Sequence, residues 1–318
     1  MTAASAARLK IVVRSYGGEN DKNRPAYYSK LLALASVVRA ASTVPEAELL
    51  FLNDGPVPPD RLALMERFGP VHQIADEPQG MRASYWYALN LPDRLGWSDD
   101  HVVFYVEDDY LFTADAFTSL ARAAEGLEEA SYFGLYGERP DYDDPADRHR
   151  FSVPRGWRAQ PARQVGPDVW FNLTSTASTF GARVGALRAD LPIFRQCMRP
   201  FKRRYLDHET CLIYQGCVPY HGRELLTGLP HDFVLSPRGV LRSAFLLPFR
   251  LALNVRARQR RQAHYLYVLT PNKATHLEHP VISRDRDWAS EAAAVARWAD
   301  ASDLPAVSER LREAQPRL

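Results

Sequence analysis

Cysteine is scarce in this chain, and the spacing that usually gives it a role is missing. The 318 residues include three cysteines, Cys197, Cys211 and Cys217, and no two of them form a CxxC pair. An odd number of cysteines without that spacing argues against a disulfide framework and against a zinc site. We therefore expect a reducing compartment, and the cytoplasm is the expected location.

Long apolar runs and lysine are also rare. Residues 1–10 lack the apolar core of a signal peptide, and no apolar run approaches the length that crosses a bilayer. Of the forty basic residues only five are lysine, and the formal net charge is +2. The basic residues gather in the last third, which differs from the uniform basicity of nucleic-acid-binding proteins. We expect no nucleic-acid partner.

Three acids follow an unbroken apolar run in the middle of the chain. Residues 102–106 (VVFYV) lead directly into Glu107, Asp108 and Asp109, after which aromatic residues resume at Tyr110. Such a run predicts a strand buried on both faces of a mostly parallel sheet, and ligands bind at the C-terminal ends of these strands. Adjacent carboxylates repel one another unless a cation holds them, so the pattern indicates a Mg²⁺ or Mn²⁺ site. A solvated acidic turn is the alternative.

Alternation along that strand predicts how the acids divide. Successive side chains of a strand point to opposite faces. Glu107 and Asp109 are therefore expected to share a face and to hold the metal, while Asp108 points the other way.

Strand and helix patterns alternate around this segment. The expected strands cover residues 9–14, 48–53, 71–74 and 131–136, and the expected helices cover 25–41, 59–68, 80–97 and 114–129, the last capped by Thr113. This alternation predicts an α/β fold with a mostly parallel central sheet flanked by helices. No GxGxxG follows the first strand, so a dinucleotide fingerprint is absent.

Polar residues at the ends of the early elements are candidate nucleotide contacts. Arg14, Ser15 and Tyr16 end the first strand and offer a guanidinium, a hydroxyl and an aromatic ring. Asp54 ends the second strand, where it suits a base or ribose, although Asp54-Gly also suits a turn. Arg82 lies in the helical segment before the central strand.

This order of elements resembles the GT-A fold of glycosyltransferases that use nucleotide sugars, in a family 2-like form. The resemblance runs from residue 9 to about residue 215, and its strongest element, VEDDY, is similar to the DXD metal motif of these enzymes, here written EDD. It implies a GT-A-like core over 1–239, with a nucleotide-sugar half before an acceptor half. It also implies that residues 240–318 form a helical, basic extension that closes the site within the same domain.

The resemblance implies a metal-dependent transfer from a nucleoside-diphosphate sugar to a hydroxyl-bearing acceptor, which is a glycan, a lipid-linked glycan or a small molecule. Asp109 would bind Mn²⁺ or Mg²⁺ directly, with Glu107 or Asp108 binding through water or holding the ribose. The other donor contacts would be Arg14, Ser15, Tyr16, Asp54 and Arg82.

Two later segments match further family motifs. In YLDHETC, Asp207 and Glu209 match an acidic motif that supplies the general base of inverting enzymes, although Leu206 stands where its first acid would be. Asp207 is expected to be the base, with helix N-cap as the alternative, and Glu209 to orient the acceptor; a retaining mechanism stays open. In TPNKATHLEHP, His276 or His279 matches a histidine that completes the metal site. We choose His276, which would favour Mn²⁺ over Mg²⁺.

The remaining segments are less regular. Residues 139–168 predict a long irregular loop, either a lid that includes Arg155, Trp157 and Arg158 or a variable insertion. Ser175 and Thr176 are candidate contacts of the donor sugar. Residues 240–262 combine apolar residues with six arginines and are interrupted by Pro248. This composition suits peripheral contact with an anionic membrane, here the inner membrane surface, or a helical pair packed on the sheet. Residues 288–311 predict a peripheral helix.

Two other function classes compete with glycosyl transfer. A nucleotidyltransferase acting on a sugar phosphate would also use acids at a strand end, but it usually carries a Gly- and Arg-rich loop after the first strand, whereas SYGGEN is short. A non-catalytic carbohydrate-binding protein would need neither metal nor base.

Overall fold

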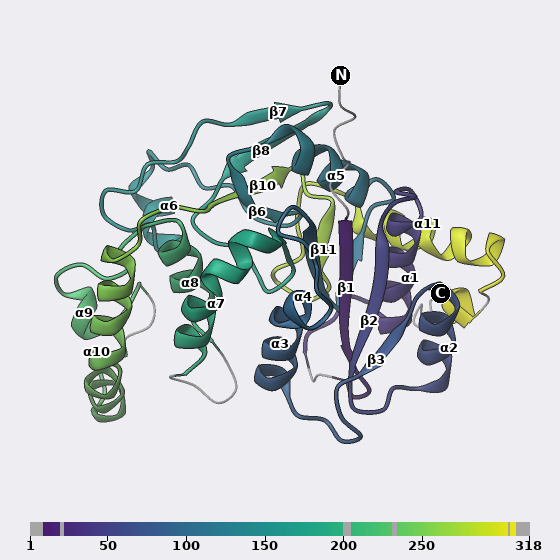
Figure 1. Ribbon diagram of the computed structural model, residues 1–318, viewed down its shortest axis with the longest axis horizontal. Helices are drawn as coiled ribbons and strands as arrows, with labels where there is room; N and C mark the ends of the chain where they lie inside the picture. Colours follow the sequence, from purple (N-terminus) through teal and green to yellow (C-terminus); the bar gives the residue numbers. More distant parts are fainter. Residues whose placement is uncertain (1–8, 20–21, 200–204, 231–233, 305, 310–318) are drawn as a thin grey trace.

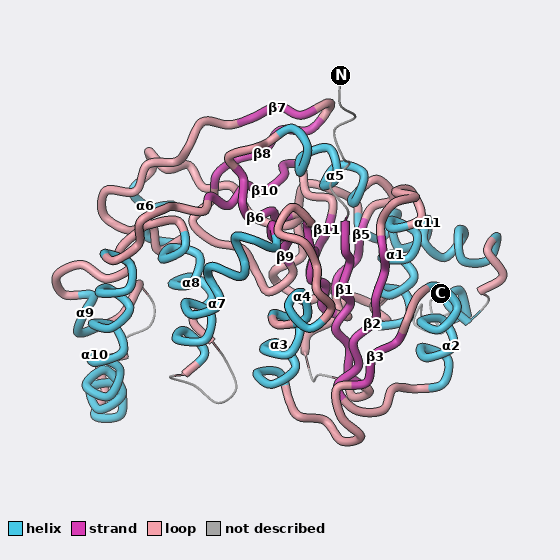
Figure 2. The backbone as a smooth tube through the Cα atoms, in the orientation of Figure 1, coloured by secondary structure: helices cyan, strands magenta, loops and turns pink. Residues whose placement is uncertain are grey.

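A nine-stranded sheet runs through the centre of the protein. The computed structural model describes residues 9–19, 22–199, 205–230, 234–304 and 306–309. The strand order is β3-β2-β1-β4-β9-β6-β10-β8-β7 (Figures 1 and 2). Strands β8 and β9 run antiparallel to their neighbours, and the other seven share one direction. The predicted α/β class with a mostly parallel sheet flanked by helices is confirmed.

The strand bounds lie close to those expected. They are β1 (Leu9–Tyr16), β2 (Glu48–Asp54), β3 (Val71–Gln73), β4 (Val102–Glu107), β6 (Ala130–Gly134), β7 (Arg163–Val165), β8 (Asp168–Asn172), β9 (Phe180–Arg183) and β10 (Tyr265–Thr270). A small second sheet pairs β5 (Tyr110–Phe112) with β11 (Ala274–His276) in antiparallel fashion. The segment after residue 239 thus contributes β10 to the main sheet, between β6 and β8.

Helices cover both faces of this sheet. They are α1 (Lys30–Ala41), α2 (Pro59–Phe68), α3 (Met81–Leu89), α4 (Leu91–Arg94), α5 (Ala116–Gly126), α6 (Pro145–Arg150), α7 (Val184–Met198), α8 (Asp207–Tyr214), α9 (Glu224–Thr227), α10 (Pro237–Arg258) and α11 (Trp288–Ala301). Alternation along the strands divides the core in two. Ile11 and Val13 pack with α1, α5 and α11, while Val12 packs with α3, α7 and α8.

Strand β4 is buried along its apolar length, as its composition predicts. Each residue from Val102 to Val106 is at most 3% exposed, because β1 and β9 pair with the strand and helices cover both faces. The chain reaches β4 from β3 by passing to the other side of β1. The strand order therefore reverses between β1 and β4, and in open α/β sheets ligands bind at such a switch point.

Several helix bounds differ from the predictions because of local capping. Helix α1 begins at Lys30 rather than near residue 25, since the Ser29 hydroxyl accepts a hydrogen bond from the Leu32 amide at 2.9 Å. Helix α5 begins at Ala116, and the predicted Thr113 cap is wrong. The Thr113 hydroxyl instead donates to the Asp115 carboxylate at 2.8 Å.

The predictions for two less regular segments also need correction. Residues 139–168 contain α6 and β7, so this segment is not loop throughout. Helix α10 continues through Pro248, where a break was expected. Proline removes one backbone hydrogen bond, but the buried residues Leu246 and Leu253 hold the turns on either side of it against the body. Among the described residues, we find no helix with the length and apolarity needed to cross a bilayer.

Candidate active site

A cavity of about 770 Å³ opens at the C-terminal ends of β1 and β4. Its lining includes eight residues expected from the sequence: Arg14, Ser15, Tyr16, Asp54, Glu107, Asp108, Asp109 and Asp207. Residues not anticipated also line it, among them Lys22, Ser178 and Tyr205. Three other candidates do not belong to this lining: Arg82, which is half-buried in the first turn of α3, Glu209 and His276. The structure thus brings most of the candidates together at the switch point.

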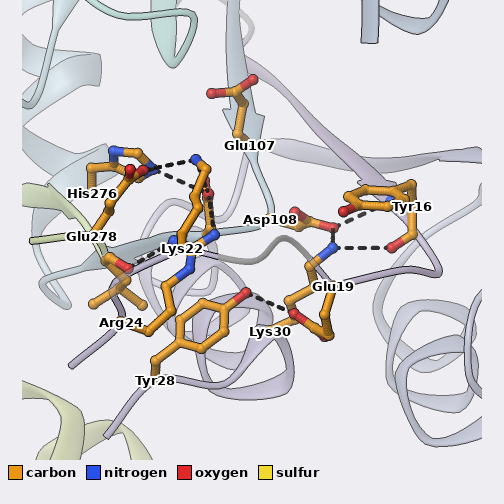
Figure 3. A network of polar contacts seen from close by, with 12 residues as sticks. Tyr16, Glu19, Lys22, Arg24, Tyr28, Lys30, Glu107, Asp108, His276 and Glu278 are labelled. Carbon is orange, nitrogen blue, oxygen red and sulfur yellow. Dashed lines mark hydrogen bonds and ion pairs between the residues drawn. The ribbon is translucent and has the colours of Figure 1, made fainter. Parts of the chain in front are cut away.

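The acids 107–109 take three separate sets of partners. Strand β4 ends at Glu107, and the chain turns through the next two residues before β5 begins. Glu107 pairs with the Arg14 guanidinium, which also donates to the Ser84 hydroxyl at 3.1 Å. In Figure 3 the Glu107 side chain points away from the group containing His276. The expectation that Glu107 and Asp109 share a face is wrong, because alternation stops where the strand stops.

Asp108 holds the turn that follows β1. Its Oδ2 accepts hydrogen bonds from the Ser15 hydroxyl at 2.6 Å and the Tyr16 amide at 3.2 Å, and the Lys30 ammonium lies 3.0 Å away (Figure 3). Lys30 is 3% exposed and also donates to the carbonyls of Tyr16 and Gly18. Asp108 therefore neutralises a buried ammonium and shapes the cavity wall.

Asp109 lies at the centre of a charged group that we call the Asp109 cluster: Lys22, Arg24, Asp109, His276 and Glu278. Oδ2 of Asp109 lies 3.0 Å from Nη2 of Arg24, 3.1 Å from Nε2 of His276 and 3.5 Å from Nζ of Lys22. Glu278 pairs with Lys22 at 2.8 Å. Burial alone would raise the pKa of Asp109, but His276, Lys22 and Arg24 outweigh it and hold that pKa well below its usual range. Asp109 is therefore an anion held by cationic neighbours.

Pairing of β5 with β11 places His276 beside Asp109. The register places His276 opposite Tyr110, and the two rings stack with centroids 4.9 Å apart. The Leu277 amide donates to the Asp109 carbonyl at 2.9 Å, and Arg24 donates to the Leu277 carbonyl at 2.7 Å. Sequence reasoning missed Lys22, Arg24 and Glu278. The available signal was the DKNRP segment after the first strand, whose charges show no periodicity.

Asp207 is the first residue of α8 and lines the other side of the cavity. The N-cap position belongs to Leu206 and no side chain caps the helix, so the N-cap interpretation of Asp207 is wrong. Burial, then the nearby carboxylates Glu107 and Glu209, raise the pKa of Asp207 well above its usual value, and Arg14 opposes them. Asp207 also lines a smaller, largely aromatic pocket. It therefore lies where a polar cavity meets an apolar one.

Glu209 faces the protein interior. It is 4% exposed, and one carboxylate oxygen accepts a hydrogen bond from the Tyr220 hydroxyl at 2.5 Å. This contact ties α8 to the segment before α9. Glu209 thus lies outside the cavity lining, and its carboxylate helps to raise the pKa of Asp207.

Asp54 bonds to backbone rather than standing free for a ribose. Its two oxygens accept hydrogen bonds from the amides of Gln79 and Gly80 at 2.7 and 2.9 Å. Gly55 follows at φ +82°, which the Asp-Gly turn requires. Asp54 lines the cavity while it fixes the loop that leads into α3.

The remaining candidates lie in or near the segment from residue 139 to residue 176. Thr176 lines the aromatic pocket beside Asp207, while Ser175 is half-buried. In the 139–168 segment Trp157 is 8% exposed, and Arg155 and Arg158 are exposed. His208 contacts the Ser152 carbonyl at 3.0 Å, which anchors this segment to α8.

The Asp109 cluster has donors suited to a divalent cation. Asp109 and His276 offer a carboxylate oxygen and an imidazole nitrogen 3.1 Å apart, a mixed pair that suits Mn²⁺. In the part of the chain that the structure describes, no group of three or more His, Cys, Asp or Glu side chains is arranged to hold a metal. Ions of this kind are commonly held by one or two carboxylates together with substrate phosphates. Two protein donors therefore fit an ion whose remaining ligands come from a substrate.

Comparisons with known proteins find similarity in structure alone. No protein-family model and no curated protein matches the sequence. The chain is similar to the galactosyltransferase LgtC in complex with donor and acceptor sugar analogues (TM-score 0.43, 16% identity, 92% of this chain and 95% of that one). It is also similar to S. aureus TarS 1-349 in complex with UDP, with a TM-score of 0.41, 13% identity, and coverage of 84% of this chain and 59% of that one. A third similar structure is glucosyl-3-phosphoglycerate synthase from Mycobacterium tuberculosis with Mn²⁺, UDP and glucosyl-3-phosphoglycerate. Its TM-score is 0.36 and its identity 11%, and the match covers 59% of this chain and 65% of that one. The chain thus spans less than two thirds of the TarS structure.

Proposed function

We propose that this protein is a GT-A-type glycosyltransferase that moves a sugar from a nucleoside-diphosphate sugar to an acceptor hydroxyl. One observation carries the proposal: a single cavity at the sheet's switch point is lined both by Lys22 and Asp109 of the Asp109 cluster and by Asp207, a buried carboxylate of raised pKa. The volume of about 770 Å³ falls within the range of pockets for ligands of this size. The site thus combines cations for a leaving group with a base for a nucleophile.

The leaving group needs positive charge. When the bond between sugar and phosphate breaks, negative charge grows on the nucleoside diphosphate. Lys22 lines the cavity beside Asp109 and its ammonium would attract phosphate oxygens, while Arg24 pairs with the same Asp109 oxygen. Asp109 and His276 would hold Mn²⁺ or Mg²⁺, which when bound would add charge stabilisation of the same diphosphate. Glu107 is left out of this ligand pair because it is paired with Arg14.

The nucleophile needs a base. An acceptor hydroxyl attacks the anomeric carbon poorly until a carboxylate within hydrogen-bond reach takes its proton. Ionised Asp207 would accept that proton as the new carbon–oxygen bond forms and the bond to phosphate breaks. Its raised pKa makes it a stronger base than an exposed aspartate. Attack from the face opposite the departing diphosphate inverts the anomeric centre.

Thermal unfolding with a panel of nucleoside diphosphates, with and without Mn²⁺, tests this function. A ligand of the native state at 100 times its Kd stabilises by about 2.7 kcal/mol. We expect one nucleotide to raise the unfolding midpoint in a Mn²⁺-dependent manner, and Asp109→Asn to lose the rise. The matched control Asp143→Asn changes an exposed aspartate and should keep it. If no nucleotide shifts the wild-type midpoint, the proposal fails. Release of the same diphosphate from its sugar nucleotide, with acceptor present, then measures transfer.

A further inference from the structure

Helix α10 turns a long apolar stripe toward solvent. Its exposed large apolar residues are Val240 (53%), Leu241 (73%), Phe245 (59%), Leu251 (47%) and Val255 (49%). At 100° per residue these side chains fall within one side of the helix. A soluble protein rarely exposes so continuous an apolar strip unless the strip contacts something.

The other side of α10 holds the helix to the body. Its buried residues include Leu246 and Leu253, and α10 contacts α7, α8 and α9. Arg250, which is 5% exposed, donates to the carbonyls of Leu225 and Leu226 and so joins α9 to α10. Both faces of α10 are thus apolar, but only one of them is covered by the described chain. Figure 1 shows α9 and α10 at one edge of the molecule, far from β1, β2 and β3.

The exposed stripe is flanked by positive charge. The helix contains five arginines and no acidic residue or lysine. The four exposed arginines are Arg238, Arg242, Arg256 and Arg258. By helical geometry the first three lie along one edge of the stripe and Arg258 lies along the other. Leu226, Val234 and Leu235, at 61%, 67% and 87% exposure, add apolar surface in α9 and just before α10.

We infer that α10 binds flat on an anionic membrane surface, with its apolar stripe among the lipid headgroups and acyl chain ends. An apolar stripe edged by arginines is the pattern of interfacial helices, and arginines near the surface add attraction for anionic lipids. A second copy of the chain fits this face less well. A symmetric dimer through α10 would bring the exposed arginines of both copies together without an acidic residue on the helix to pair with them. This surface does not depend on the proposed function.

Flotation of the full chain with vesicles tests the inference. Wild-type protein should float with vesicles of phosphatidylcholine and phosphatidylglycerol, float much less with pure phosphatidylcholine vesicles, and be released by salt. The double variant Leu241→Ser, Phe245→Ser should bind at least about tenfold more weakly, since two apolar side chains no longer enter the interface. Arg242→Gln should weaken binding about fivefold, the effect expected of one arginine near such a surface.

Controls separate membrane binding from general effects. Leu95→Ser and Arg155→Gln change an exposed leucine and an exposed arginine outside α10 and should bind as wild type does. Because all substituted side chains are exposed, the unfolding midpoints should stay close to that of wild type. Two results would overturn the inference. One is equal, negligible flotation with both vesicle types. The other is a wild-type dimer in analytical ultracentrifugation that the Leu241→Ser, Phe245→Ser variant loses, which would assign the stripe to a second copy.

Discussion

Nε2 of His276 lies 3.1 Å from Oδ2 of Asp109, although 167 positions separate the two residues in the chain. The small β5–β11 sheet brings them together, and the lysine and arginine after β1 reach the same carboxylate oxygen. An imidazole and two cations thus surround one carboxylate, and Asp109 and Lys22 of this group line the cavity. This arrangement lets charge substitutions test the role of each group separately.

Lys22→Met should weaken binding of a nucleoside diphosphate more than binding of the nucleoside alone. The lysine side chain lines the cavity and is 31% exposed, so its ammonium, which pairs with Asp109 and Glu278, is also within reach of a phosphate in the cavity. Loss of one charged hydrogen bond worth about 1.5 kcal/mol predicts roughly tenfold weaker diphosphate binding. Isothermal titration calorimetry measures both ligands. Lys22→Arg keeps the charge and serves as the control, and an equal loss for nucleoside and diphosphate would contradict a phosphate-binding role.

Asp108→Ala should lower the free energy of unfolding more than it lowers turnover. The Lys30 ammonium would keep its carbonyl partners but lose the carboxylate that balances its buried charge. Leaving such a charge uncompensated costs about 3–5 kcal/mol. Urea denaturation measures the change. Asp108→Asn retains a hydrogen-bond acceptor for Ser15 and the Tyr16 amide and should cost less. Stability of Asp108→Ala within about 0.5 kcal/mol of wild type would rule out this role for Asp108.

Asp207→Asn should abolish turnover and yet stabilise the fold at neutral pH. Because the folded protein raises the pKa of Asp207, the folded state holds its proton more tightly than the unfolded state does. Stability therefore falls as pH rises from about 3.9, the unfolded value, through the raised folded pKa. Asparagine cannot ionise, so this loss should disappear, while kcat should fall roughly 10²–10⁴-fold without a base.

Two measurements check the Asp207 prediction. Unfolding midpoints from pH 4 to pH 8 should decline less in Asp207→Asn than in wild type, and wild-type kcat/KM should rise with pH through the raised pKa. Asp143→Asn, an exposed counterpart, should match wild type in both. Near-normal turnover of Asp207→Asn would remove this residue from the mechanism.

Tyr220→Phe should lower stability while leaving the chemical step nearly unchanged. The substitution removes a hydroxyl that donates to the buried Glu209 carboxylate at 2.5 Å. A buried carboxylate that loses a donor costs about 1–3 kcal/mol. Chemical denaturation and steady-state kinetics measure the two effects. Tyr136→Phe removes a hydroxyl bonded to the Val281 carbonyl at an exposed position and should cost less. A large fall in kcat without loss of stability would instead place Glu209 in direct contact with the acceptor.

The main strands and the general position of the site are predictable from local composition. Residues 102–106 are β-branched or aromatic and carry no charge, so they indicate a buried strand by themselves, and the acids after them mark its C-terminal end. Helix bounds are less predictable, because a single contact such as the Ser29 cap moves the start of α1 by several residues. Pro248 shows the opposite case, where packing keeps a helix intact despite a breaker.

The partner of each acid is not predictable from local pattern. Glu107, Asp108 and Asp109 are adjacent in the chain, yet they contact Arg14, Lys30 and His276 respectively. Alternation failed to divide them because it holds only while the backbone stays extended, and β4 ends at Glu107. Lys22, Arg24 and Glu278 were missed because they lie in segments without periodicity.

The sequence by itself determined the α/β class, the buried β4 strand, the acids at its end and the apolar, arginine-rich composition of α10. These features follow from side-chain period and hydrophobicity, which act over a few residues. Only the tertiary structure decided which carboxylate meets His276, which one balances Lys30, and which face of α10 remains uncovered. Those outcomes depend on burial and charge pairing between segments far apart in the chain, and such pairing exists only after the sheet and its helices have packed.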